Sequence, residues 1–183
     1  MNYLLPAQAG AQFASLLIYI LIARWYVAPW LAARERAEAL IALLWLHVFR
    51  YVALQIFAAQ REGFPISRGG AMEIVIGDVG GAAIALAAII LLRRKSRWGV
   101  WLCWLLVAET AIDTFLNISG GVKEHLMGAA TGVVWMILVF FVPAIVVSLG
   151  LMAWQLVTRR LEALAEGEQV RAPIMGTRLQ EQQ

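Results

Sequence analysis

Charged residues are scarce in this chain of 183 residues. Asp, Glu, Lys and Arg make up 15% of it, whereas soluble globular domains contain about 25%. Apolar residues account for 62% and the mean hydropathy is +0.75. This balance argues against a soluble globule and predicts an integral membrane protein, which we expect in the inner membrane of a bacterium.

Cysteine and histidine are also scarce. The single cysteine, Cys103, excludes an intrachain disulfide and a thiolate metal cage. The two histidines, His47 and His125, are expected to differ in membrane depth by roughly 15 Å or more, because His47 lies near mid-membrane and His125 in an outer loop. A bis-His haem is therefore not favoured, and no motif indicates another cofactor.

Sequence motifs that carry catalytic chemistry are absent. The chain has no HExxH motif, histidine box, CxxC pair, P-loop or dinucleotide fingerprint, and none of its serines lies in a nucleophile elbow. Its net charge of +3 does not indicate a nucleic-acid partner, because the basic residues lie at the ends of hydrophobic runs. The sequence therefore assigns no catalytic residue and leaves open whether the protein is an enzyme.

Long hydrophobic runs are the dominant feature. Each of five runs is long enough to cross a bilayer as a helix, and together they predict an all-α, five-helix transmembrane bundle over residues 1–157. The predicted spans cover about residues 8–31, 38–60, 71–92, 98–118 and 128–157. The fifth is longer than a span needs, so we expect it to tilt, to kink at Pro143 or to extend into the cytoplasm. Residues 158–183 are predicted to form a cytoplasmic tail that begins as a helix and then becomes flexible.

The distribution of basic residues predicts the orientation of the bundle. If the loop at residues 93–97 is cytoplasmic, eleven of the fifteen Lys and Arg residues lie on the cytoplasmic side. Cytoplasmic loops of membrane proteins carry an excess of Lys and Arg. We therefore expect the N-terminus outside and the C-terminus inside.

A stripe of polar residues interrupts the fourth hydrophobic run. Glu109, Asp113 and Asn117 follow one another at four-residue spacing, which places them on one face of a helix. An ionisable side chain at membrane depth costs about 2.5–3.5 kcal/mol on insertion scales. Two acids on one stripe therefore indicate a binding site or an aqueous pathway rather than residues that only hydrogen-bond neighbouring helices together.

Further polar residues are expected at similar depth on neighbouring helices. His47, Tyr51 and Gln55 share one predicted helix face, Arg50 borders that face, and Asp78 lies on the third span. Arg50 remains protonated when buried, so we expect it to pair with one carboxylate. By depth that carboxylate is Asp78 or Glu109, which leaves the other acids without an obvious cation.

Small residues on the third span allow close helix packing. Gly77 and Gly81 form a small-xxx-small face beside Asp78. Plain packing against a neighbouring helix is the simpler interpretation of these glycines. A second interpretation is that close approach narrows a polar cavity.

Three functional hypotheses follow. The first is an outward-facing acidic pocket that binds or translocates a proton, a cation or a small polar ligand. The second is a membrane-embedded enzyme or metal-binding subunit that uses Glu109, Asp113, Asp78 and His47. The third is an accessory subunit of a larger membrane complex, and a homo-oligomer is also compatible with the sequence. In each case the lipid bilayer is the expected surrounding.

Overall fold

Five long helical stretches form the protein. The computed structural model describes residues 4–162, and in that range its regular structure is entirely helical. The stretches that are long and apolar enough to span a membrane are Leu4–Ala32, Arg36–Arg61, Arg68–Arg93, Trp98–Lys123 and Gly132–Thr158. The five-helix prediction is confirmed, with boundaries that differ by up to about five residues at helix ends.

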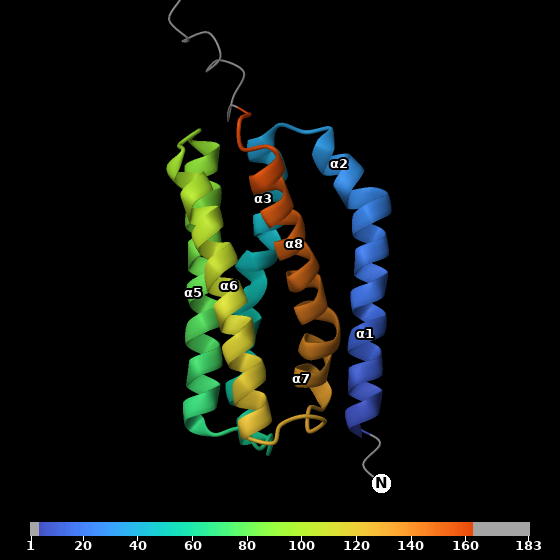
Figure 1. Ribbon diagram of the computed structural model, residues 1–183. Helices are drawn as coiled ribbons and strands as arrows, with labels where there is room; N and C mark the ends of the chain where they lie inside the picture. The colour runs from blue at the N-terminus through green and yellow to red at the C-terminus, as the bar shows by residue number, and fades with distance from the viewer. Residues whose placement is uncertain (1–3, 163–183) are drawn as a thin grey trace, which may run out of the picture.

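The helices run up and down in an elongated bundle (Figure 1). Helices α5 (Arg68–Arg93) and α6 (Trp98–Lys123) lie side by side at one edge, and α1 (Leu4–Ile22) lies at the other edge next to α8 (Val142–Thr158). Helix α3 (Arg36–Val48) packs against both α5 and α8. We call the end of the bundle that holds Leu4 the entry end, and the end that holds Thr158 the exit end.

Two of the long helices contain a π-helical segment next to a proline. The segment η1 (Ala23–Val27) precedes α2 (Ala28–Ala32) with Pro29 in its first turn, and η3 (Ile137–Phe141) separates α7 (Gly132–Met136) from α8 with Pro143 in its first turn. Proline lacks a backbone N–H and its ring clashes with the carbonyl four residues earlier. Widening the preceding turn relieves that clash while the helix continues. For the fifth span, where a tilt, a kink at Pro143 or an extension was expected, the structure shows this π-helical segment next to Pro143.

The second long helix has a tighter central turn. The 3₁₀ segment η2 (Phe49–Leu54) connects α3 to α4 (Gln55–Arg61) and contains neither proline nor glycine. Buried residues through this region recur every third position, at His47, Arg50, Ala53 and Ile56. That spacing is the repeat of a 3₁₀ helix, in which residues three apart lie above one another.

The 3₁₀ segment corrects the predicted polar face of this helix. The expected four-residue spacing placed His47, Tyr51 and Gln55 together, but His47 is buried while Tyr51 and Gln55 are exposed. Tighter winding rotates Arg50 under His47 and turns Tyr51 away from the α5–α6 pair.

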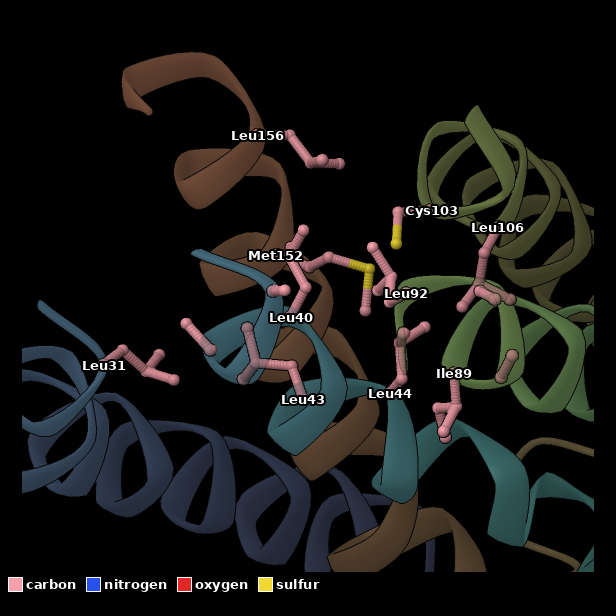
Figure 2. Close-up of a cluster of buried hydrophobic side chains, with 14 residues drawn as sticks. Leu31, Leu40, Leu43, Leu44, Ile89, Leu92, Cys103, Leu106, Met152 and Leu156 are labelled. Carbon is pink, nitrogen blue, oxygen red and sulfur yellow. The ribbon is translucent and has the colours of Figure 1, made fainter. Parts of the chain in front are cut away.

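Two hydrophobic clusters fill the two ends of the bundle. The cluster at the exit end joins α2, α3, α5, α6 and α8, and Figure 2 shows residues such as Leu40, Leu92, Leu106 and Met152 pointing toward one another. A second cluster at the entry end includes Ile56, Val75 and Val134. Arg50, Asp78, Glu109 and Asp113 lie along the helices between these two clusters.

Helix ends at the turns are closed by recognisable caps. Ser67 is the N-cap of α5, and its hydroxyl accepts a hydrogen bond from the Gly70 N–H at 2.9 Å. Lys95 after α5 and His125 after α6 both adopt left-handed backbone conformations, with φ of 57° and 56°. The crossed hydrogen bonds Ser96 N–Leu91 O and Leu126 N–Gly121 O identify both ends as Schellman motifs, in which glycine is the usual residue.

The last helix ends earlier than predicted. Helix α8 stops at Thr158, and residues 159–162 form turns, so the helix does not continue into the first part of the tail. Arg159 instead donates hydrogen bonds to the Arg34 carbonyl at 2.8 Å and the Leu31 carbonyl at 3.3 Å. A cation at these carbonyls is favourable because the C-terminal end of a helix carries partial negative charge. The remainder of the predicted tail lies outside the described residues.

Candidate functional site

Arg50 forms the centre of a cluster of charges in the middle of the bundle. Its side chain is 2% exposed, and three carboxylates from two neighbouring helices contact its guanidinium. Nε donates to Asp78 at 2.7 Å, Nη1 to Glu109 at 2.9 Å and Nη2 to Asp113 at 2.8 Å. We call Arg50, Asp78, Glu109 and Asp113 the charge cluster.

Two uncharged residues of α6 complete the hydrogen bonds around the cluster. Thr110 is almost fully buried, and its hydroxyl accepts from Arg50 Nη1 at 2.7 Å and donates to Glu109 at 3.1 Å. Asn117 donates from its amide to Asp113 at 3.2 Å. The predicted stripe Glu109–Asp113–Asn117 therefore faces a common site, and Thr110 is a member that the four-residue spacing did not identify.

Two glycines on α5 provide the space that the cluster occupies. A Cβ added at Gly77 would collide with the Asp113 carboxylate, and one added at Gly81 would collide with the Arg50 guanidinium. At Gly80, by contrast, an added Cβ would meet no atom within 4 Å. Gly77 and Gly81 therefore make room for charged side chains between α5, α6 and η2. This role is more specific than the plain helix packing that was the simpler interpretation of these glycines.

The pairing of Arg50 differs from the prediction. A single partner, Asp78 or Glu109, was expected, but Arg50 contacts both of these and Asp113 as well. The planar guanidinium has donors pointing in several directions, so it can bridge carboxylates on two helices. No acid in the cluster lacks contact with the cation, although three carboxylates still share one positive charge.

The carboxylates, rather than the arginine, form the accessible side of the cluster. Their side chains are 23% exposed for Asp78, 21% for Glu109 and 12% for Asp113. Each uses one oxygen to contact Arg50, and the second oxygen accepts no hydrogen bond from the described residues. None of these second oxygens is among the fully buried unpartnered atoms. Each therefore has a lone pair available to a proton, a water molecule or a cation.

His47, Tyr51 and Gln55 are not in contact with the acids. His47 is fully buried beside the exit-end cluster, and neither ring nitrogen has a hydrogen-bond partner among residues 4–162. Tyr51 lines a separate cavity of about 1050 Å³ between the first, second and fifth long helices. That cavity is lined largely by apolar side chains, with Ser148 and Tyr19 among the few polar ones.

The residues considered for metal binding do not form a metal site. Within the described part of the chain, no group of three or more His, Cys, Asp or Glu side chains is placed to hold a metal ion. The three acids converge on a guanidinium, and His47 donates a hydrogen bond to none of them. The charge cluster is therefore an arginine-centred ion network.

Fold and site together define a five-helix bundle, with helices of membrane-spanning length and composition, built around an arginine–carboxylate network. Residues 8–157 match a family described as a domain of unknown function, DUF8737. The match covers most of the chain, which therefore belongs to this family. No curated protein and no solved structure matches the chain.

Proposed function

We propose that the protein is an integral membrane protein whose charge cluster binds a proton or a small cation delivered from outside the cell. The entry end faces outward and the exit end faces the cytoplasm, in the inner membrane of a bacterium. The observation that carries this proposal is the ratio of three carboxylates to one guanidinium in the middle of the bundle.

Charge balance is the first argument. With all three acids ionised, the cluster carries two negative charges in excess of Arg50. An uncompensated buried ion costs several kcal/mol even after structural relaxation. Uptake of one proton or monovalent cation by the free carboxylate oxygens halves that excess charge, so the geometry favours the occupied form.

Depth supports access from the entry end. At 1.5 Å per residue, Asp78 lies roughly 15 Å from the start of α5 and Asp113 roughly 15 Å from the end of α6, and both of these termini are at the entry end. On the other side, the exit-end cluster of Leu, Ile, Ala and Met side chains separates the acids from the cytoplasmic turns. The entry-end cluster is smaller, with six buried residues against fourteen, and contains none from α6. We therefore expect binding and release on the entry side, and transport would require a second conformation.

Infrared spectroscopy of the purified protein tests proton binding directly. A protonated carboxyl group gives a C=O band distinct from the carboxylate bands, and we expect such a band to disappear as the pH is raised. Asp113→Asn should remove or shift this band, whereas Glu73→Gln, which removes an exposed acid from the same bundle, should not. A spectrum without a titrating carboxyl band, together with a melting temperature insensitive to added monovalent and divalent cations, would refute the proposal.

Flux measurements then separate binding from transport. Liposomes containing the wild-type protein, Asp113→Asn or Glu73→Gln are compared for proton and cation uptake under an imposed gradient. Flux that is lost only in Asp113→Asn supports translocation through the cluster. Absence of flux in all three samples, with the titrating band retained, limits the function to binding.

A further inference from the structure

A second polar site lies at the exit end, well separated from the charge cluster. A groove of about 810 Å³ opens between the start of α3, the turn from α5 to α6 and the end of α8. Its polar lining consists of four basic residues and one acid, which are Arg36, Lys95, Arg97, Arg160 and Glu162. Figure 1 shows these segments gathered at the top of the bundle.

The acid in the groove is already paired outside it. The Glu162 carboxylate contacts Arg159 at 2.6 Å, and Arg159 does not line the groove. Nearby hydrogen bonds from Arg159 hold the pKa of Glu162 below its usual value, so Glu162 stays ionised and committed to that pair. The four basic residues form no ion pair with any residue in the range 4–162.

Arg36 is the most informative of the four. It is only 7% exposed, and no carboxylate of the described residues lies within ion-pair distance of it, although the Glu162 carboxylate attracts it at longer range. Nη1 reaches two carbonyls at the end of α8, those of Arg160 at 3.5 Å and Glu162 at 3.3 Å, and the buried Nε has no partner. A buried guanidinium with an unsatisfied donor is costly, and an anion that accepts from it removes the cost.

The rest of the groove is apolar and aromatic. Trp101 and Trp104 from the first turns of α6 form one wall, and Leu156 and Val157 of α8 form another. Tryptophan is enriched where membrane proteins meet the headgroup region, and arginine binds phosphate oxygens through two parallel hydrogen bonds. Basic pockets between helix ends at the cytoplasmic surface are suited to anionic lipid headgroups.

We propose that this groove binds the phosphate headgroup of an anionic phospholipid, with an acyl chain lying along the two tryptophans. The basic residues supply the charge, and the apolar wall distinguishes a lipid from free phosphate. The site does not depend on proton or cation binding at the charge cluster.

Two glycine substitutions provide a matched test. Lys95 and His125 occupy the same left-handed position in equivalent Schellman motifs, one in the groove and the other at the opposite end of the bundle. Lys95→Gly and His125→Gly therefore relieve the same backbone strain, but only Lys95→Gly removes a charge from the groove. A second charge variant, Arg97→Gln, changes an exposed side chain without altering the backbone preference.

The measurement is lipid retention by native mass spectrometry of the delipidated full chain in detergent, with melting temperature as a second readout. Phosphatidylglycerol, phosphatidylcholine and inorganic phosphate are added separately. We expect retention and a raised melting temperature with phosphatidylglycerol only. Apparent affinity should fall about fivefold in Lys95→Gly and in Arg97→Gln, with no change in His125→Gly, since one surface cation contributes roughly this factor.

Three outcomes would overturn the proposal. Equal retention of phosphatidylcholine would show that the groove does not select charge. A melting shift of the same size with inorganic phosphate would indicate a site for free anions instead of a lipid. Equal affinity for phosphatidylglycerol in Lys95→Gly, Arg97→Gln and His125→Gly would place the lipid elsewhere.

Discussion

At the scale of single residues, Arg50 holds the centre of the bundle together. It connects η2 to both α5 and α6 through three carboxylates, and it is the sole cation in contact with them among the described residues. The cluster therefore responds differently to losing its cation and to losing one of its acids.

Replacing the cation should be far more damaging than replacing one acid. Arg50→Met leaves three acids without a counter-ion and should lower the free energy of unfolding by about 3–5 kcal/mol. Asp113→Asn reduces the excess negative charge and keeps an oxygen that can accept from Arg50, so its effect should stay within about 1 kcal/mol. Denaturation of both variants in the same detergent compares them, and equal destabilisation would mean that Arg50 is not the electrostatic centre.

The glycines of α5 give a second prediction at this scale. Gly77→Ala and Gly81→Ala place a methyl group where the Asp113 carboxylate and the Arg50 guanidinium lie, and each should destabilise by about 1–3 kcal/mol. Gly80→Ala meets open space and should be neutral or stabilising, because alanine is the better helix former by about 1 kcal/mol. Thermal unfolding of the three variants measures this, and a loss in Gly80→Ala similar to the others would point to general packing.

The sequence identified most of these residues but not their connection. Four-residue spacing correctly placed Glu109, Asp113 and Asn117 on one face, because α6 is a regular α-helix. The same spacing failed for His47, Tyr51 and Gln55, because the helix tightens at Phe49–Leu54 without any proline or glycine to signal it. The 3₁₀ segment contains Arg50, whose partners Asp78, Glu109 and Asp113 are distant in sequence. Residue spacing within one helix carries no information about such contacts.

At the scale of elements, two connections at the entry end are joined by one carboxylate. Glu124, just after α6, accepts from the Ser67 hydroxyl at 2.6 Å and from the Ser67 N–H at 2.8 Å. These hydrogen bonds, the side-chain one first, hold the pKa of Glu124 below its ordinary value of 4.5. The α4–α5 and α6–α7 connections are thereby fastened together at neutral pH.

This fastening should weaken in acid. Because the pKa of Glu124 is lowered in the folded state, its stabilising effect is present above pH 4.5 and is lost as the pH falls through the lowered value. In the wild-type protein, amide hydrogen exchange at Ser67 and Gly70, corrected for intrinsic rates, should therefore be faster in acid than at neutral pH. Glu124→Gln should show the faster exchange already at neutral pH, and an unchanged profile would contradict the role of this carboxylate.

Helix ends were less predictable than helix cores. Hydrophobic runs located all five long helices, since length and composition suffice for that. The ends at Lys95 and His125 lack the glycine that usually marks a left-handed cap, so the Schellman turns could not be predicted from residue type. A left-handed backbone conformation is strained for any residue with a Cβ atom, and glycine relieves that strain. Lys95→Gly and His125→Gly should therefore each raise the free energy of unfolding by about 1 kcal/mol, as measured by denaturant unfolding.

At the scale of the whole molecule, layers alternate along the bundle axis. The charge cluster lies between an apolar cluster at each end, and the basic groove lies beyond the exit-end cluster. The proposed orientation places that groove at the cytoplasmic surface and the smaller entry-end cluster toward the outside.

Cysteine labelling tests the orientation with little background, because the native Cys103 is fully buried. In intact bacteria, a membrane-impermeant maleimide should label Glu62→Cys in the α4–α5 connection. It should label Ser96→Cys in the α5–α6 turn only after the cells are permeabilised. The reverse labelling pattern would show that the bundle has the opposite orientation, so a cation would reach the charge cluster from the cytoplasm.

The central position of Arg50 has a consequence for biogenesis. The chain emerges from the ribosome with the arginine-bearing helix ahead of both helices that carry its acids. For a chain inserted as proposed, this helix enters the bilayer with an unneutralised cation, at a cost of about 2.5–3.5 kcal/mol, until α5 and α6 arrive. We therefore expect the nascent helices to be retained at the insertion machinery and released only once α6, the fourth long helix, is made.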